Sequence, residues 1–301
     1  MHHNASVSAA ADGDDMQALL CPTAVGDDRF RALQGVRDSG RVFGGRLVSE
    51  ALLSAAQTVD PAFRPHSLHA QFLRPCDGDR ETIYQVERVR DGRNFCNRAI
   101  RIQQGADVNA LVMLSFAADP PGVERQAPMP AVPAPDTLVD ERILRKSLVK
   151  NDKILADFFW KRDHPVEFRP VDLPVSQMDR EGKLTTWFRA KPQFLSLDTL
   201  VARAALLAYA SDRFVMTSAV LPHLSLLSTR DISIASLDHS LWIHRDFAPA
   251  EWLLYVVESV TSAGSRSFVR GQMFAENGDH IASVGQEGLL AIRLRSSSPE
   301  N

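Results

Sequence analysis

Three cysteines are the first side chains in this sequence that could do chemistry, as nucleophiles, redox pairs or metal ligands. They are Cys21, Cys76 and Cys96, widely spaced and odd in number. This spacing excludes a disulfide framework and any CxxC metal motif, and it is typical of a reducing compartment. A reactive thiol needs a neighbour that stabilises its thiolate, and the sequence indicates none. We therefore expect structural cysteines in a cytoplasmic protein.

Four histidines in strand-like segments are the next candidates. His66 and His69 are three residues apart, and on a strand this spacing points side chains to opposite faces. No cysteine or carboxylate nearby completes a ligand set, so the sequence predicts no metal and no cofactor. We expect His239 and His244 to form hydrogen bonds within a sheet.

A glycine pair, Gly44 and Gly45, stands before a helical segment. No Lys-Ser/Thr follows it, so it is not a phosphate-binding loop, and no Gly-x-Ser-x-Gly occurs anywhere in the chain. Two interpretations remain for the pair. It allows close packing at a helix entrance, or it aims a backbone amide at a substrate oxygen from a helix N-terminus.

Composition excludes several classes of partner. The 301 residues carry 34 Lys and Arg against 37 Asp and Glu, a net charge of −3, so no basic excess supports nucleic-acid binding. The longest uncharged run, 214–229, is shorter than the roughly 20 residues of a membrane span, and Pro222 interrupts it. The N-terminus has no signal-peptide pattern, and residues 1–15 are small, polar and acidic, which predicts disorder.

A proline-rich segment divides the chain into two halves of similar size. Six of the 17 prolines lie at positions 120, 121, 128, 130, 133 and 135. Proline opposes both helix and central strand, so we expect an extended linker. The predicted organisation is a domain at 16–117, a linker and crossover at 118–165, and a second domain at 166–296.

Each half repeats one order of elements. An alanine-rich helix comes first, at 47–56 and at 200–210, the second with Ser196 or Asp198 as its expected N-cap. Strand patterns follow each helix, at 66–73, 81–90, 95–104 and 109–117, and then at 232–244, 252–259, 267–275 and 280–294. This predicts an α+β double hotdog: two antiparallel sheets, each wrapped round a central helix, that form one continuous sheet.

Motifs in both halves support a family assignment. The first half contains Arg-Val-Phe-Gly-Gly at 41–45, His-Ser-Leu-His-Ala-Gln-Phe-Leu-Arg-Pro at 66–75 and Val-Arg-Asp-Gly-Arg-Asn-Phe at 89–95. The second contains Tyr-Ala-Ser-Asp at 209–212, Leu-Asp-His-Ser-Leu-Trp-Ile-His-Arg at 237–245 and Gln-Glu-Gly at 286–288. Over about residues 17–293 the chain resembles the acyl-CoA thioesterase II family. It departs from the family pattern at Arg46 and Cys76.

The resemblance implies a catalytic set of an acid, a hydroxyl and an amide. Carried over by position, these are Asp212, Ser236 and Gln286. Asp212 falls at the end of a helix, where the dipole makes a carboxylate more basic and a better general base. Overlaying the two halves places Val59 opposite Asp212 and Met113 opposite Gln286. Only the second half is then expected to be catalytic, with Gly44 and Gly45 contacting the thioester.

The function that the resemblance implies is hydrolysis of medium- or long-chain acyl-CoA to fatty acid and CoA by an Asp-activated water. The alternative is a non-catalytic acyl-CoA-binding or regulatory protein on the same fold, because fold does not fix function. A hydratase is disfavoured, since 40–51 contains neither the Asp nor the His it needs. Hotdog sheets usually pair, so we expect a homodimer or a larger homo-oligomer.

Overall fold

A computed structural model of the protein describes residues 21–32, 40–118, 121–148, 165–171, 181–191, 199–223, 232–248 and 250–292. The expected disordered segment 1–15 lies outside the described residues, as do Ser196 and Asp198. The domain boundaries at 117 and 165 remain predictions.

The first half is a helix followed by four antiparallel strands, with a short hairpin at their edge. The hairpin is β1 (Thr23–Gly26) and β2 (Arg29–Arg31), and the helix is α2 (Gly44–Ala56). The four strands are β3 (Arg64–Phe72), β4 (Ile83–Asp91), β5 (Phe95–Gln104) and β6 (Asp107–Ala117), of which β4 to β6 form a meander and β3 pairs with β6. Gly105 turns the chain between the last two strands with a φ of +65°, a left-handed conformation that glycine adopts without strain.

The second half repeats this plan with additions. Its strands are β7 (Val166–Pro170), β8 (Lys183–Ala190), β9 (Ile232–Ser236), β10 (Asp238–Ile243), β11 (Leu253–Ala263), β12 (Arg266–Ala275) and β13 (His280–Ile292). The central helix is α5 (Leu200–Ser211), followed by α6 (Val215–Val220) and the short η4 (Leu221–His223). Thr199 caps α5 by accepting a hydrogen bond from Ala202 N, so the cap is neither of the two residues expected from the sequence.

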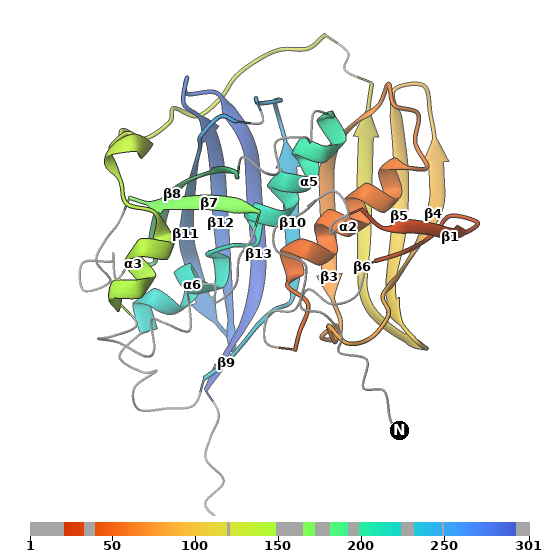
Figure 1. Ribbon diagram of the computed structural model, residues 1–301, viewed down its shortest axis with the longest axis horizontal. Helices are drawn as coiled ribbons and strands as arrows, with labels where there is room; N and C mark the ends of the chain where they lie inside the picture. The colour runs from red at the N-terminus through yellow and green to blue at the C-terminus, as the bar shows by residue number, and fades with distance from the viewer. Residues whose placement is uncertain are drawn as a thin grey trace, which may run out of the picture.

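All described strands belong to one antiparallel sheet. Its order is β1-β2-β4-β5-β6-β3-β10-β13-β12-β11-β8-β7, with β9 pairing with β13 at one end. The two halves join where β3 pairs with β10, in a register that sets Leu68 opposite Leu241. Figure 1 shows the two halves side by side, with α2 and α5 on the same face of this sheet. The expected double hotdog with one continuous sheet is confirmed.

The two central helices pack against each other in opposite directions. Gly45 lies against Tyr209 O, and Ser49 Oγ donates to Ala205 O over 2.9 Å. Alanines at 51, 55, 204, 205 and 208 are all buried, and their small side chains let the backbones approach closely. The antiparallel arrangement brings the N-terminus of α2 to the C-terminus of α5, and this junction holds the candidate site.

The segment between the halves runs over the surface as an extended strap, then forms η1 (Pro135–Thr137) and α3 (Glu141–Leu148). Long-range hydrogen bonds hold the strap: Trp187 Nε1 donates to Pro133 O, and Gln126 Nε2 donates to Gly278 O. Glu141 of α3 forms a buried ion pair of 2.6 Å with Arg213, next to Asp212 in sequence. The crossover is therefore tied to the C-terminal end of α5.

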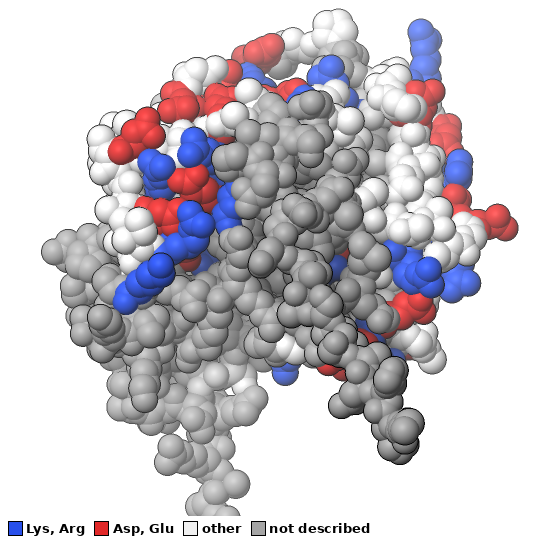
Figure 2. All heavy atoms as spheres, in the orientation of Figure 1, with Lys and Arg blue, Asp and Glu red and all other residues white. Residues whose placement is uncertain are grey.

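The run Leu200–His223 has the length and apolar composition of a membrane-spanning helix. However, 78% of its most apolar window is buried inside the protein, as expected for a core helix. In the view of Figure 2, acidic and basic side chains are interspersed over the described part of the surface.

Candidate active site

Asp212 lies at the C-terminal end of α5, where the chain leaves the helix. Phe214 follows with a φ of 70°, a left-handed conformation that ends α5 and starts α6. The Asp212 carboxylate is partly buried and accepts a hydrogen bond of 2.9 Å from Gly45 N at the start of α2. One half of the chain thus supplies the acid, and the other supplies a helix N-terminus that binds it.

The glycine pair is needed because the Asp212 side chain occupies the space beside it. A Cβ on Gly44 would stand 2.7 Å from Asp212 Oδ2, and one on Gly45 would collide with Tyr209 O and the Phe43 ring. The structure therefore favours the close-packing interpretation. The amide of Gly45 is bonded to the acid, which leaves the N–H of Gly44 as the candidate donor to a substrate.

Ser236 and Gln286 join this acid from the sheet. Gln286 is fully buried on β13, and its Nε2 donates to Ser236 Oγ over 2.9 Å. The pairing of β9 with β13 holds Ser236 opposite Gly288, and this register sets the distance between the side chains of Ser236 and Gln286. The Gln286 side chain also lies close enough to the Asp212 carboxylate to lower its pKa. The structure thus brings together the three residues that the resemblance selected.

Burial dominates the electrostatics of Asp212. It raises the pKa of this carboxyl from 3.8 to about 7, against hydrogen bonds from Gly45 and Gln286 and the charge of Arg213, which lower it. The sequence argument relied on the helix dipole, whereas removal from water is the larger cause. A carboxylate of this basicity can accept a proton from water near neutral pH.

His239 forms a hydrogen bond within the sheet, as expected, and its partner Gln286 makes it part of this site. It is fully buried, with Nδ1 2.6 Å from Gln286 Oε1 and Nε2 2.8 Å from Ser211 Oγ. Burial lowers its pKa to about 4, so the ring is neutral at pH 7. The sequence signal that could have located His239 is its place shortly after Ser236, on a strand that pairs with the strand of Gln286.

The prediction that His66 and His69 point to opposite faces is wrong. A bulge between Pro65 and Ser67 turns His66 to the outer face, where its Nε2 lies 2.9 Å from Ser115 Oγ. His69 is exposed on that face, with its Nδ1 3.1 Å from Ser240 Oγ. Among the described residues, no three His, Cys, Asp or Glu side chains are grouped to hold a metal.

Of the other predictions from the sequence, some are confirmed and one is wrong. His244 Nε2 lies 2.9 Å from Ser283 Oγ on the neighbouring strand, as expected. Burial raises the pKa of the Cys76 thiol to about 12, so it is a poor nucleophile. The overlay of Met113 on Gln286 is wrong, because Met113 is 43% exposed on the outer face whereas Gln286 is buried. The inner-face residues of β6 near it, Leu114 and Phe116, are also apolar.

This site, an acid, a hydroxyl and an amide between two hotdog halves, defines a class of hydrolase. The model of the acyl-CoA thioesterase family matches residues 159–289, and the model of the acyl-CoA thioesterase N-terminal domain matches 34–117. The two matches fall on the two halves of the sheet.

Relatives agree along the whole chain. It is 31% identical to the human protein named acyl-coenzyme A thioesterase 8, over 94% of this chain and 92% of that one. It is 34% identical to acyl-CoA thioesterase 2 of Haemophilus influenzae, over 83% and 87% of the two chains. The solved acyl-CoA thioesterase II TesB2 of Mycobacterium marinum superposes with a TM-score of 0.75 at 30% identity, covering 93% and 99%. The chain therefore belongs to the acyl-CoA thioesterase family, whose members are thioester hydrolases.

Proposed function

We propose that this enzyme hydrolyses medium- or long-chain acyl-CoA with Asp212 as the general base. The observation that carries the proposal is the Asp212 carboxyl, whose pKa is raised to about 7 and which accepts a hydrogen bond from the Gly45 amide. Asp212 takes a proton from water as the water oxygen attacks the thioester carbon. The carbon–sulfur bond then breaks, and the leaving thiolate takes the proton, which gives fatty acid and CoA.

The surroundings of the carboxylate suit a fatty acyl chain. Phe72 Cζ lies 3.2 Å from the Cβ position of Gly44, and the Phe43 ring borders Gly45. Met216 of α6 lies directly against Gly288 of β13, two residues after Gln286. These apolar side chains can exclude water from the acyl group while the polar trio contacts the thioester.

The test is thiol release from a panel of acyl-CoA substrates from C2 to C18. Asp212→Asn should lower kcat about 10²–10⁴-fold, the usual contribution of a general base, and change KM little. Asp279→Asn, at a surface turn, is the matched control. Near-wild-type turnover by folded Asp212→Asn would refute the base. A wild-type protein that binds decanoyl-CoA but releases no thiol would replace hydrolysis with acyl-CoA binding.

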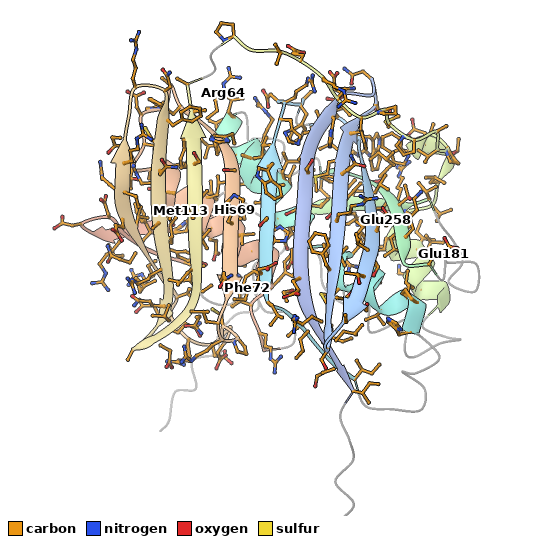
Figure 3. All side chains as sticks on the ribbon, turned by 180° about the vertical axis from the view of Figure 1, so that it is seen from behind. Arg64, His69, Phe72, Met113, Glu181 and Glu258 are labelled. Carbon is orange, nitrogen blue, oxygen red and sulfur yellow. The ribbon has the colours of Figure 1, made fainter. Side chains whose placement is uncertain are left out.

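We also propose a homodimer or larger assembly that buries the outer face of the sheet. Met113, Trp242 and Phe268 are 40–43% exposed there. His69 contacts the Trp242 ring at 5.1 Å, and Trp242 and Phe268 both lie over Gly285, so the strip is continuous. Figure 3 shows His69 and Met113 near the middle of this face. A strip of this kind is typical of an interaction site.

Light scattering at micromolar concentration tests this assembly. A monomeric mass would contradict the proposal, and Trp242→Glu should shift a dimer toward monomer. A cytoplasmic location is part of the same proposal, supported by three cysteines that are all free thiols. Cell fractionation would test it.

A further inference from the structure

We propose that His239 is a positioning residue that fixes which end of the Gln286 amide faces the reacting groups, and that this makes the Ser236 hydroxyl a hydrogen-bond donor to the thioester oxygen. The inference rests on the proposed function of the site. It adds a residue and a direction of hydrogen bonding to that function.

The geometry is a chain of four side chains, of which three are wholly buried. Ser211 Oγ lies 2.8 Å from His239 Nε2, and His239 Nδ1 lies 2.6 Å from Gln286 Oε1. Gln286 Nε2 lies 2.9 Å from Ser236 Oγ. The exposed fractions of Ser211, His239 and Gln286 are all 0%. Buried polar groups that are left unpaired cost free energy, so each contact must be a real donor–acceptor pair.

Asp212 determines the direction of this chain. An ionised carboxylate only accepts hydrogen bonds, so the end of the Gln286 amide that faces Asp212 must be the NH2 group. Its oxygen, Oε1, must then face His239. A carbonyl oxygen cannot donate, so His239 has to carry its proton on Nδ1. The other ring nitrogen, Nε2, is then an acceptor.

Ser211 supplies the proton that Nε2 needs. Its hydroxyl also lies 2.9 Å from Ala208 O, and one proton cannot serve both acceptors. If Ser211 donated to Ala208, His239 would carry its proton on Nε2 and turn a bare Nδ1 toward Gln286 Oε1. Two acceptors would then meet at 2.6 Å, or the amide would turn over and present its oxygen to the carboxylate. Both outcomes are unfavourable while Asp212 is ionised.

The direction has a chemical consequence at the end of the chain. Ser236 Oγ accepts from Gln286, so the hydroxyl proton of Ser236 points away from the amide. It can donate to the thioester oxygen as negative charge develops there, in the manner of an oxyanion-hole donor. Asp212 then activates the water while Ser236 polarises the carbonyl.

Few charged groups of the described part of the chain face the two residues. Asp212 is faced by Gly45 N from α2, Gln286 from β13 and Arg213 beside it in the chain, while the Tyr255 hydroxyl of β11 donates to Ser211 O nearby. His239 is faced by Ser211, Gln286 and the charge of Asp238. Loss of the Gln286 donor should therefore raise the pKa of Asp212.

Two substitutions of His239 separate positioning from mere packing. In His239→Asn the amide nitrogen can take the place of Nδ1 and donate to Gln286, whereas in His239→Gln the amide reaches toward Ser211 and that donor is lost. We expect His239→Gln to lower kcat about 10–100-fold, the usual effect of losing one hydrogen bond to a reacting group, while His239→Asn recovers most of kcat. His244→Gln, on the outer face, is the control with unchanged activity.

The pH profile gives a readout that a packing role would not move. In His239→Gln the acidic limb of kcat should shift to higher pH because the ionised Asp212 has lost a donor. In His239→Asn the limb should stay near its wild-type position. Equal losses in His239→Asn and His239→Gln with unmoved limbs would overturn the proposal.

The tautomer can be measured without any activity. The ¹⁵N spectrum of the wild-type imidazole, assigned by the signal that His239→Asn removes, should show the Nδ1–H form at pH 8. An Nε2–H form would overturn the proposal. Absence of thioesterase activity together with the Nδ1–H form would instead count against hydrolysis while the hydrogen-bond direction held.

Discussion

Replacing the Asp212 carboxyl should stabilise the protein, and the gain should grow with pH. Burial raises the pKa of Asp212 from 3.8 to about 7, so the folded protein holds a proton that the unfolded chain releases between these values. Stability is then full below pH 4 and is lost as pH rises to 7, because folding must keep an ionised carboxylate away from water. The side chain introduced by Asp212→Asn keeps the shape and the acceptor oxygen but has no charge to bury.

The pKa of Asp212 differs by about three units between the folded and the unfolded protein, which corresponds to about 4 kcal/mol at 1.36 kcal/mol per unit. Between pH 5.5 and pH 8 the wild type should lose about 2 kcal/mol relative to Asp212→Asn, reduced to about 1–2 kcal/mol by partial contact with solvent. Comparing one pair of proteins at two pH values cancels every effect of the substitution that does not depend on pH.

Urea unfolding at pH 5.5 and pH 8, followed by fluorescence, measures both free energies of unfolding. Asp279→Asn is the control, and its difference from wild type should not grow between these pH values. A difference between Asp212→Asn and wild type that is the same at both pH values would refute the conclusion that Asp212 titrates near 7. The result bears on mechanism, since an acid that ionises at pH 4 would be a weak base for water.

Two further substitutions test the supports of the carboxylate. Gly44→Ala should displace it, because the new Cβ would lie 2.7 Å from Asp212 Oδ2; we expect kcat to fall at least about 10-fold, against no change for Gly122→Ala, where nothing lies within 4 Å. Glu141→Gln removes the 2.6 Å ion-pair partner of buried Arg213 and should lower the free energy of unfolding by about 3–5 kcal/mol, measured in urea. An unchanged midpoint and slope would contradict the latter.

The sequence predicted the architecture well because it depends on patterns local to each element. The alanine-rich helices and eight strand segments of the sheet were identified from spacing and turn residues, although the segment 232–244 forms two strands, β9 and β10. No strand was predicted at β7, β8 or the edge hairpin of β1 and β2. The bulge at His66 was missed because one extra residue in a strand changes which face a side chain occupies, and no feature of the local sequence predicts it.

The site was predictable only through family motifs. From residue type alone, Asp212 is only an acid at the end of a helix, and Ser236 and Gln286 are only polar side chains on strands. Their meeting depends on contacts across the fold, such as Gly45 N to Asp212 over 167 positions in the chain. His239 was underestimated because its role depends on what both ring nitrogens face, which follows from the register of three strands.

The two halves use a buried carboxyl in opposite ways, and this predicts reciprocal mutants. In the first half Glu50 is 1% exposed, forms a 2.7 Å ion pair with Arg46 and accepts a hydrogen bond from Tyr84. Sealed from solvent, it can neither receive water nor deliver a proton to substrate. Asp212 accepts a hydrogen bond from a neutral amide and is only partly buried, so it keeps its proton affinity available for chemistry.

Glu50→Gln should therefore leave kcat within about 2-fold but lower the free energy of unfolding by about 3–5 kcal/mol, because it breaks the buried ion pair with Arg46. Asp212→Asn should do the reverse, losing kcat while gaining stability. Urea unfolding and thiol release on the same preparations compare the two. A Glu50→Gln enzyme that folds as stably as wild type but has lost its turnover would indicate a second reactive acid in the first half. That result would contradict the prediction that only the second half is catalytic.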